Sequence, residues 1–185
     1  VVNMGIFTGK GKDVKKVIEE ARRKKQEQEN GEKLDYKKIK INKDLKKAGD
    51  SIRVRILGAY DYTTYEAHGS FEKGVWNTPC IDPDGTQEKR CLHCEASKME
   101  GFKDLKSTTR FLFAFYDIDM EMIRYIEVSY TQGCSLMDDI EENEEDIEDT
   151  AFILKRSGEG TKTTYKLSAI LKLGKKDPDA QERFD

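Results

Sequence analysis

Four potential metal ligands, His68, Cys80, Cys91 and Cys94, follow one another with eleven, ten and two intervening residues. The short interval between Cys91 and Cys94 lets one tight turn direct two thiolates at a single ion, and the other two residues complete the tetrahedral donor set that zinc prefers. The stretch from Gly74 to Arg90 is rich in Gly, Pro and Asp and cannot bury a core of its own. The sequence therefore predicts one structural zinc ion (Zn²⁺) per chain, which supplies the folding free energy that packing cannot. The alternative is that the cysteines are unrelated free thiols.

Two histidines compete for the fourth ligand position. His93 lies inside the turn between Cys91 and Cys94, where its side chain points away from an ion held on either side, whereas His68 comes from a separate extended segment. We therefore expect His68 to be the ligand. Cys134 lies far from the cluster in sequence and is expected to be a buried or idle thiol. The first residues show no basic region followed by an apolar one, so we expect no secretory signal and no disulfide framework.

Enzymatic zinc chemistry is not expected. Zinc deaminases combine H-x-E with P-C-x-x-C, whereas here His68 is followed by Gly-Ser and the pair Pro79-Cys80 by Ile-Asp-Pro. Four protein ligands also close a zinc site to a reacting water. The sequence contains no H-E-x-x-H, no G-x-x-x-x-G-K-[ST] and no G-x-S-x-G motif. We expect a binding protein rather than an enzyme.

Charge is distributed unevenly along the chain, although the formal net charge is only -3. Residues 1–110 hold 24 Lys and Arg against 18 Asp and Glu, whereas residues 111–185 hold 9 against 18. Electrostatic recognition depends on local clusters, so the basic half keeps nucleic-acid binding open. No run approaches the roughly 18 consecutive apolar residues that a membrane span needs, and no membrane partner is expected.

The 185 residues fit one domain with appendages. Residues 1–49 are expected to form a charged arm, in which residues 13–28 form a helix with one thin apolar stripe. The basic run at residues 22–25 is either a solvated face or a contact for phosphates or a neighbouring subunit. Residues 174–185 are expected to form a short acidic tail. Nine carboxylates between residues 138 and 149 form either a solvated helix face or a docking site for a partner.

The central part, residues 50–173, is expected to be mainly β. Between Ser51 and Ile56, apolar residues alternate with Arg53 and Arg55, which predicts a strand with a buried and an exposed face. Similar runs predict strands at 51–56, 109–117, 122–129, 151–156 and 163–170, helices at 95–102 and 133–148, and a zinc-binding insertion at about 66–96. Five strands with a helix between the third and fourth match the order of a five-stranded oligonucleotide-binding (OB) barrel.

Such barrels bind single strands through strand faces and loops, with basic side chains for phosphates and aromatic rings for bases. The candidate phosphate contacts are Arg53, Arg55, Lys73, Arg124, Lys155 and Arg156. The candidate stacking residues are Tyr60, Tyr62, Tyr65, Phe71, Trp76 and Tyr125, although barrels also need aromatic side chains as filling. Phe111, Phe113 and Phe115 alternate on one strand and are predicted to lie in the core.

Residues 50–170 resemble the zinc-containing single-stranded DNA-binding proteins of tailed phages. The resemblance is carried by SIRVRILGAYDYTTYEAHGSFEKGVWNTPC, CLHC, RFLFAFYDI and FILKRSGEGTKTTYKLSAI. It implies an OB fold with a structural zinc, bound by His68, Cys80, Cys91 and Cys94. It also implies a protein that coats and protects single-stranded DNA without sequence preference during phage replication, recombination and repair in the cytoplasm of the bacterial host. Replication or recombination proteins would be partners of the acidic segments, and self-association stays open.

A competing function is a zinc-stabilised protein-interaction module of a replication or transcription complex that makes no direct contact with DNA. Its charge asymmetry would then serve the docking of a protein partner. The two functions differ in how binding to a single strand depends on salt, because the release of counterions from phosphates makes affinity fall steeply as salt rises.

Overall fold

The computed structural model describes residues 36–87 and 90–185 and consists mainly of β structure. Residues 37–185 form one compact unit. The predicted helix at residues 13–28 and its basic run lie outside the described residues. Within the described ranges, no helix combines the length and the apolar character that crossing a membrane requires.

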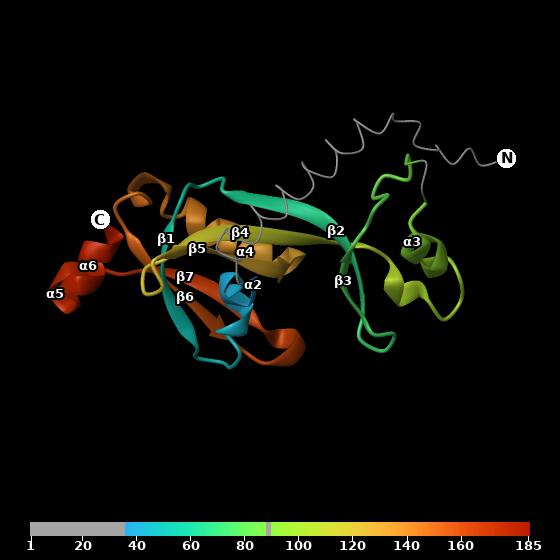
Figure 1. The fold of residues 1–185 in the computed structure, drawn as a ribbon, viewed down its shortest axis with the longest axis horizontal. Helices are drawn as coiled ribbons and strands as arrows, with labels where there is room; N and C mark the ends of the chain where they lie inside the picture. Colours follow the sequence, from blue (N-terminus) through green and yellow to red (C-terminus); the bar gives the residue numbers. More distant parts are fainter. Residues whose placement is uncertain (1–35, 88–89) are drawn as a thin grey trace, which may run out of the picture. The chain divides into compact units, whose positions relative to one another are not determined.

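Seven strands form one curled antiparallel sheet with the form of a half-barrel (Figure 1). They are β1 (Ser51–Ile56), β2 (Tyr62–Ser70), β3 (Val75–Pro79), β4 (Thr108–Asp117), β5 (Met122–Ser129), β6 (Ala151–Ser157) and β7 (Thr164–Ala169). The pairing order is β3-β2-β4-β1-β6-β7, and β5 pairs with the remaining edge of β4. The prediction of a mainly β fold is confirmed. The count of five strands is wrong, because β2 and β3 add two strands to the expected set.

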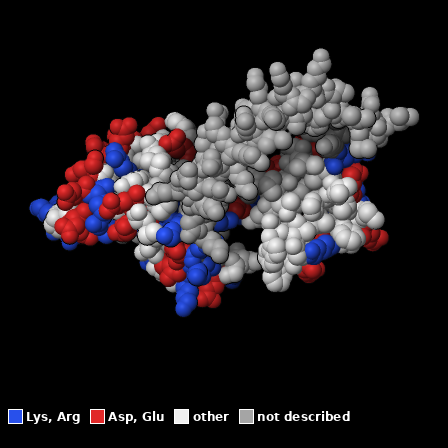
Figure 2. Space-filling view, viewed as in Figure 1, with Lys and Arg blue, Asp and Glu red and all other residues white. Residues whose placement is uncertain are grey.

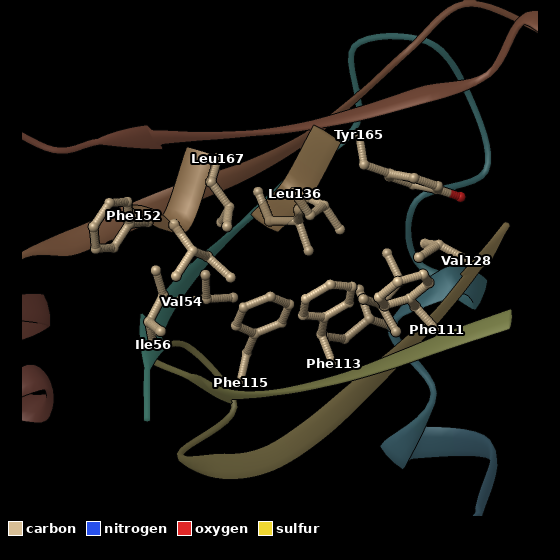
Figure 3. Close-up of a cluster of buried hydrophobic side chains, with 14 of the residues drawn as sticks. Val54, Ile56, Phe111, Phe113, Phe115, Val128, Leu136, Phe152, Tyr165 and Leu167 are labelled. Carbon is tan, nitrogen blue, oxygen red and sulfur yellow. The ribbon is translucent and has the colours of Figure 1, made fainter. Parts of the chain in front are cut away.

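The hydrophobic core lies on one face of β4. Phe111, Phe113 and Phe115 are at most 6% exposed, as the alternation of the strand predicts. Figure 3 shows their rings pointing from β4 toward Leu136 of α4 (Tyr130–Glu141). Each buried phenylalanine contributes about 1.5–3 kcal/mol through apolar area removed from water. This face of the sheet is therefore occupied by packing, and any binding surface on these strands must use the opposite face.

Helix α4 covers the opening of the half-barrel between β5 and β7. It begins where Gln132 accepts a hydrogen bond from the Ser129 N–H at 3.0 Å. Two of its side chains then bind the backbone beside β7: Asp139 accepts from the Leu167 N–H at 2.7 Å, and Gln132 donates to the Thr163 carbonyl at 2.7 Å. The helix starts and ends earlier than the predicted range of 133–148, and a short 3-10 turn, η3 (Glu144–Asp146), follows it.

The segment before β1 belongs to the folded unit. It contains α2 (Tyr36–Ile39) and the 3-10 turn η1 (Ile41–Lys43), and both Ile41 and Leu45 are completely buried in the core. The side chain of Asn42 binds the backbone of Glu127 in β5 in both directions, at 2.9 and 3.0 Å. The core therefore begins upstream of residue 50, where the sequence analysis expected the arm to end.

The residues predicted to form a short acidic tail, 174–185, lie in two short helices, α5 (Leu173–Lys176) and α6 (Pro178–Phe184). Leu173 and Phe184 are buried in a second hydrophobic cluster with Ile118 and Ala151. On the face shown in Figure 2, acidic and basic side chains are interspersed over α5 and α6. The cluster thus joins these helices to Ile118, which follows β4, and to Ala151 at the start of β6.

Candidate metal centre and nucleic-acid interface

The four predicted metal ligands lie together. The ligand atoms of His68, Cys80, Cys91 and Cys94 are all within 4.8 Å of one another. His68 Nε2 is 3.3 Å from Cys91 Sγ and 3.6 Å from Cys94 Sγ, and the Sγ atoms of Cys80 and Cys94 are 3.4 Å apart. Donors at about 2.0–2.3 Å around one tetrahedral ion lie about 3.5–3.8 Å from each other. The cluster is therefore compatible with one structural metal site.

The orientation of His68 suits a metal ligand. Its ring is fully buried, and Nδ1 donates a hydrogen bond to the Leu105 carbonyl at 2.6 Å, which leaves Nε2 to face the thiols. Metal-binding histidines commonly have such a carbonyl partner on the second ring nitrogen. His93 stacks on His68 with 5.2 Å between the ring centroids and stays outside the cluster. The structure thus brings His68 to the three cysteines, as the sequence predicts.

The thiols differ in how easily they ionise. Burial opposes ionisation of Cys91, but the N–H groups of Cys94, Ile81 and His93 outweigh it and lower the pKa of Cys91 to about 6. Burial, together with the neighbouring Cys80 and Cys91, raises the pKa of Cys94 to about 12. Three thiolates crowded in one buried cluster repel one another, so a cation is needed to hold all of them deprotonated.

The cluster of four metal-ligand residues lies at the end of β2 that is away from the core. Strand β2 pairs with β4 through Tyr62 to Ala67 and with β3 through Ala67 to Ser70, so it links the barrel to the cluster. At the turn of the β2–β3 hairpin, Phe71 and Trp76 pack edge to face with 5.3 Å between ring centroids, and they are 81% and 67% exposed. The two predicted stacking residues of the insertion therefore form a solvent-exposed aromatic pair.

The other four predicted stacking residues meet in one open groove of about 880 Å³, which we call the tyrosine groove. Its lining residues are Leu57, Tyr60, Asp61, Tyr62, Thr63, Tyr65, Pro79, Leu112, Phe113, Ala114, Tyr125 and Glu127. Tyr60 is 74% exposed at the rim. Tyr62 is partly buried instead, because its ring also packs against Phe113 of the core at 5.5 Å between ring centroids.

The floor of the groove lies on the face of the sheet opposite the core, whereas Tyr62 and Phe113, which pair with each other, belong to the core face and border the groove. Leu112 and Ala114 alternate with the core phenylalanines of β4, and they pair with Glu127 and Tyr125 of β5. On the other edge of β4, Thr63 of β2 pairs with Leu112. Residues directly opposite each other on neighbouring strands share a face. Strands β2, β4 and β5 therefore form the groove's floor.

A network of charged and polar groups borders the tyrosines. Glu127 has a side chain only 9% exposed, and it accepts hydrogen bonds from Lys40 at 2.5 Å, Asn77 at 2.5 Å and Arg110 at 3.4 Å. Burial alone would raise the pKa of Glu127, but Lys40 and Arg110 hold it below its usual value. Burial and the charge and hydrogen bond of Glu127 raise the pKa of Tyr65 to about 12.

The arginines of β1 are paired within the protein. Arg53 forms ion pairs with Asp119 and with Asp177, the latter at 2.6 Å. Arg55 donates to the Phe184 carbonyl at 3.1 Å, and its guanidinium lies over the Phe184 ring. The face of β1 that the sequence predicts to be exposed is thus engaged by α6 and the β4–β5 turn.

The remaining candidate phosphate contacts are scattered. Arg124 is 2% exposed and pairs with Asp117 and Asp44, and Arg156 donates to the carbonyls of Leu45 and Lys46. Lys73 pairs with Asp104 at 2.7 Å beside the hairpin turn, and Lys155 is exposed on β6. The structure does not bring these side chains to the tyrosine groove.

Sequence reasoning missed three residues beside the groove, namely Lys40, Arg110 and Glu127. Arg110 is two residues before Leu112 and pairs with Tyr65, so its position on the groove face follows from strand alternation once β2 and β4 are paired. The alternation was visible in the sequence, but the pairing was not. A parallel β-bridge between the backbones of Lys40 and Tyr125 places Lys40 beside the groove, and no local sequence pattern predicts this bridge.

Comparisons with known proteins identify no relative: no family model, no curated protein and no solved structure matches the chain.

Proposed function

We propose that this protein binds single-stranded DNA without sequence preference, in the tyrosine groove, and that a structural zinc ion held by His68, Cys80, Cys91 and Cys94 orders the adjoining hairpin. The observation that carries the proposal is the gathering of Tyr60, Tyr62, Tyr65 and Tyr125 in one groove. Aromatic faces accept any base, and each stacked base contributes about 1–3 kcal/mol. Resemblance to the zinc-containing single-stranded DNA-binding proteins of tailed phages implies the same function.

The connectivity of the sheet supports an OB fold. Without β2 and β3, the pairing order is β5-β4-β1-β6-β7, with α4 between β5 and β6. An OB fold is a five-stranded, partly open barrel that binds oligonucleotides on the face of its second and third strands. Those strands correspond to β4 and β5, whose outer face carries the groove. The fold and the groove thus support the proposal independently of the tyrosine count.

Zinc fits the metal cluster because three thiols and one imidazole are donors that it accepts in closed structural sites. When bound, the ion supplies charge for the thiolates and a fixed geometry, and no catalytic step. Its expected part in the function is to hold β3 and α3 (Leu92–Ser97) together, so that Phe71 and Trp76 present their rings in a fixed position at the β2–β3 hairpin.

Binding is tested by titrating the protein with oligo-dT and with duplex DNA at two salt concentrations, while its intrinsic fluorescence is followed. We expect the single strand to bind much more tightly, because stacking on the tyrosines requires unstacked bases. Tyr125→Ala and Tyr65→Ala should each weaken binding about 5- to 150-fold, the equivalent of about 1–3 kcal/mol.

Tyr130→Ala is the matched control, since Tyr130 is 58% exposed and lies outside the groove lining. It should bind like the unmodified protein. Equal affinity for duplex and single strand would contradict the proposal. Absence of any binding to oligo-dT would favour the protein-interaction module instead.

A further inference from the structure

Two cations and one carboxylate meet at the tyrosine groove. Lys40 Nζ lies 2.5 Å from one oxygen of Glu127, and Arg110 Nη2 lies 3.4 Å from the other. Glu127 lines the groove, and its side chain is almost completely buried, whereas those of Lys40 and Arg110 are 29% and 20% exposed. The cluster therefore has an excess of one positive charge, and its cations reach solvent more than its anion does.

Both cations flank the rings proposed to stack on bases. Arg110 lies on the groove face between Tyr65 of β2 and Ser129 of β5, according to the strand register. Lys40 lies at the free edge of β5, where its backbone bridges to Tyr125. A strand that stacks on Tyr65 and Tyr125 therefore runs past Arg110, which is opposite Tyr65, and past Lys40, whose backbone bridges to Tyr125. Its phosphates follow one another at spacings of several ångströms, within reach of both.

Arg110 has donor capacity to spare. Its Nε is buried and has no hydrogen-bond partner among the described residues, and its contact with Glu127 at 3.4 Å is long for a charge-assisted hydrogen bond. A guanidinium offers five N–H donors that match the oxygens of a phosphate. The present pairing with Glu127 therefore leaves much of that capacity unused.

We propose that Lys40 and Arg110 bind the phosphodiester backbone of the strand in the tyrosine groove. Glu127 is a positioning residue that holds both side chains at the groove until a phosphate replaces its carboxylate. This inference rests on the proposed function and assigns phosphate contacts to residues outside the set expected from the sequence.

The exchange has a direct energetic consequence. When a phosphate takes over Lys40 and Arg110, the Glu127 carboxylate loses two of its partners and remains close to a second anion. Like charges at short range in a partly buried site are unfavourable. Neutralising Glu127 should therefore tighten binding, whereas removing either cation should weaken it and reduce the number of phosphates neutralised.

The experiment measures the salt dependence of binding of a fluorescent oligo-dT by anisotropy, for the full chain and for Lys40→Gln, Arg110→Gln and Glu127→Gln. Each cation variant should bind several-fold more weakly and should reduce the slope of log K against log salt by about 0.7, the value for one phosphate on a single strand. Glu127→Gln should bind more tightly with an unchanged slope.

Arg53→Gln is the control, because Arg53 is paired with Asp119 and Asp177 and does not line the groove. Its slope should not change. Arg110→Lys keeps the charge and should keep the slope; an equal loss of slope in Arg110→Lys and Arg110→Gln would overturn the proposal. Unchanged slopes in both Lys40→Gln and Arg110→Gln would also overturn it. If the unmodified chain does not bind oligo-dT, the proposed function itself is wrong.

Discussion

At the scale of single residues, His68 has a tightly constrained environment. Its imidazole is fully buried, and one ring nitrogen is committed to the Leu105 carbonyl. The other nitrogen faces Cys91 and Cys94 at 3.3 and 3.6 Å. A buried ring nitrogen without a strong partner is unfavourable, and thiols are weak donors. A metal ion satisfies this nitrogen and the thiolates together.

Replacement of the two histidines tests this assignment. His68→Ala removes one of four ligands, and we expect the bound zinc, measured by elemental analysis of purified protein, to fall from one ion per chain to well below one. His93→Ala is the control, because His93 stacks on His68 but stays outside the cluster. It should retain the ion. The reverse result would exchange the roles of the two histidines, and protein that contains no metal at all would refute the site.

At the scale of elements, the contact between α4 and β4 depends on a glycine. A Cβ added at Gly133 would overlap the ring of Phe111, so only glycine lets the helix approach the strand this closely. Glycine inside a helix ordinarily costs about 0.5–1 kcal/mol relative to alanine. Here the close approach of α4 to the core of the sheet outweighs that cost.

We expect Gly133→Ala to destabilise the protein, although alanine is the better helix former. Overpacking a filled core costs about 1–3 kcal/mol, and urea unfolding followed by circular dichroism measures the loss in the free energy of unfolding. Ser135→Ala on an exposed position of the same helix should change stability by no more than about 0.5 kcal/mol. A Gly133→Ala protein as stable as the unmodified one would show that the helix can shift without loss.

Periodicity in the sequence predicts five of the seven strands closely. Strands β1 and β5 begin and end where expected, and β4, β6 and β7 differ by at most one residue at each end. These strands have one face in the core, so their apolar residues alternate. Strands β2 and β3 lack this pattern, because they leave the core and continue to the metal cluster. The sequence marked their residues only as an extended segment and a loop.

The grouping of the four candidate metal ligands was predictable from the sequence and the surroundings of the candidate phosphate contacts were not, for one physical reason. A metal site restricts residue type and spacing, so His68 and three cysteines stand out in a single sequence. A surface charge carries no such restriction. Arg53 and Arg55 alternate outward from β1 as expected, yet α6, more than 120 residues later, pairs with them. The exposure of these two arginines therefore depends on a contact between β1 and α6, which are far apart in the sequence.

At the scale of the whole folded unit, the sheet and the metal-binding region are stabilised by different means. Among the described residues, neither hydrophobic cluster has a member between residues 68 and 107. That region is tied to the sheet by the pairing of β2, and it is held together internally by the contacts of Lys73 and Ser70 with Asp104 and by the ligand cluster. A structural zinc contributes on the order of 10 kcal/mol or more in small domains. With zinc bound as proposed, the metal-binding region depends on the ion for its order, whereas the sheet has the two hydrophobic clusters.

Removal of zinc with a chelator should therefore lower the melting temperature while far-UV circular dichroism keeps most of its β signal. Trp76 is the single tryptophan and lies on the hairpin, so its fluorescence anisotropy should fall as the hairpin loses its anchor. Affinity for oligo-dT should decrease with it. Complete unfolding of the metal-free protein would contradict the independence of the sheet, and unchanged affinity would exclude Phe71 and Trp76 from the binding site.

The open form of the half-barrel has a consequence for how the protein behaves at high concentration. Unpaired strand edges recruit strands of other molecules and promote fibres. Here Asn42 occupies the backbone of β5 at Glu127, and Asp139 occupies that of β7 at Leu167. The third edge, β3, is only five residues long and ends in Pro79, which has no N–H to offer. Two short side chains and one imino acid thus keep an incomplete barrel from growing by edge-to-edge aggregation.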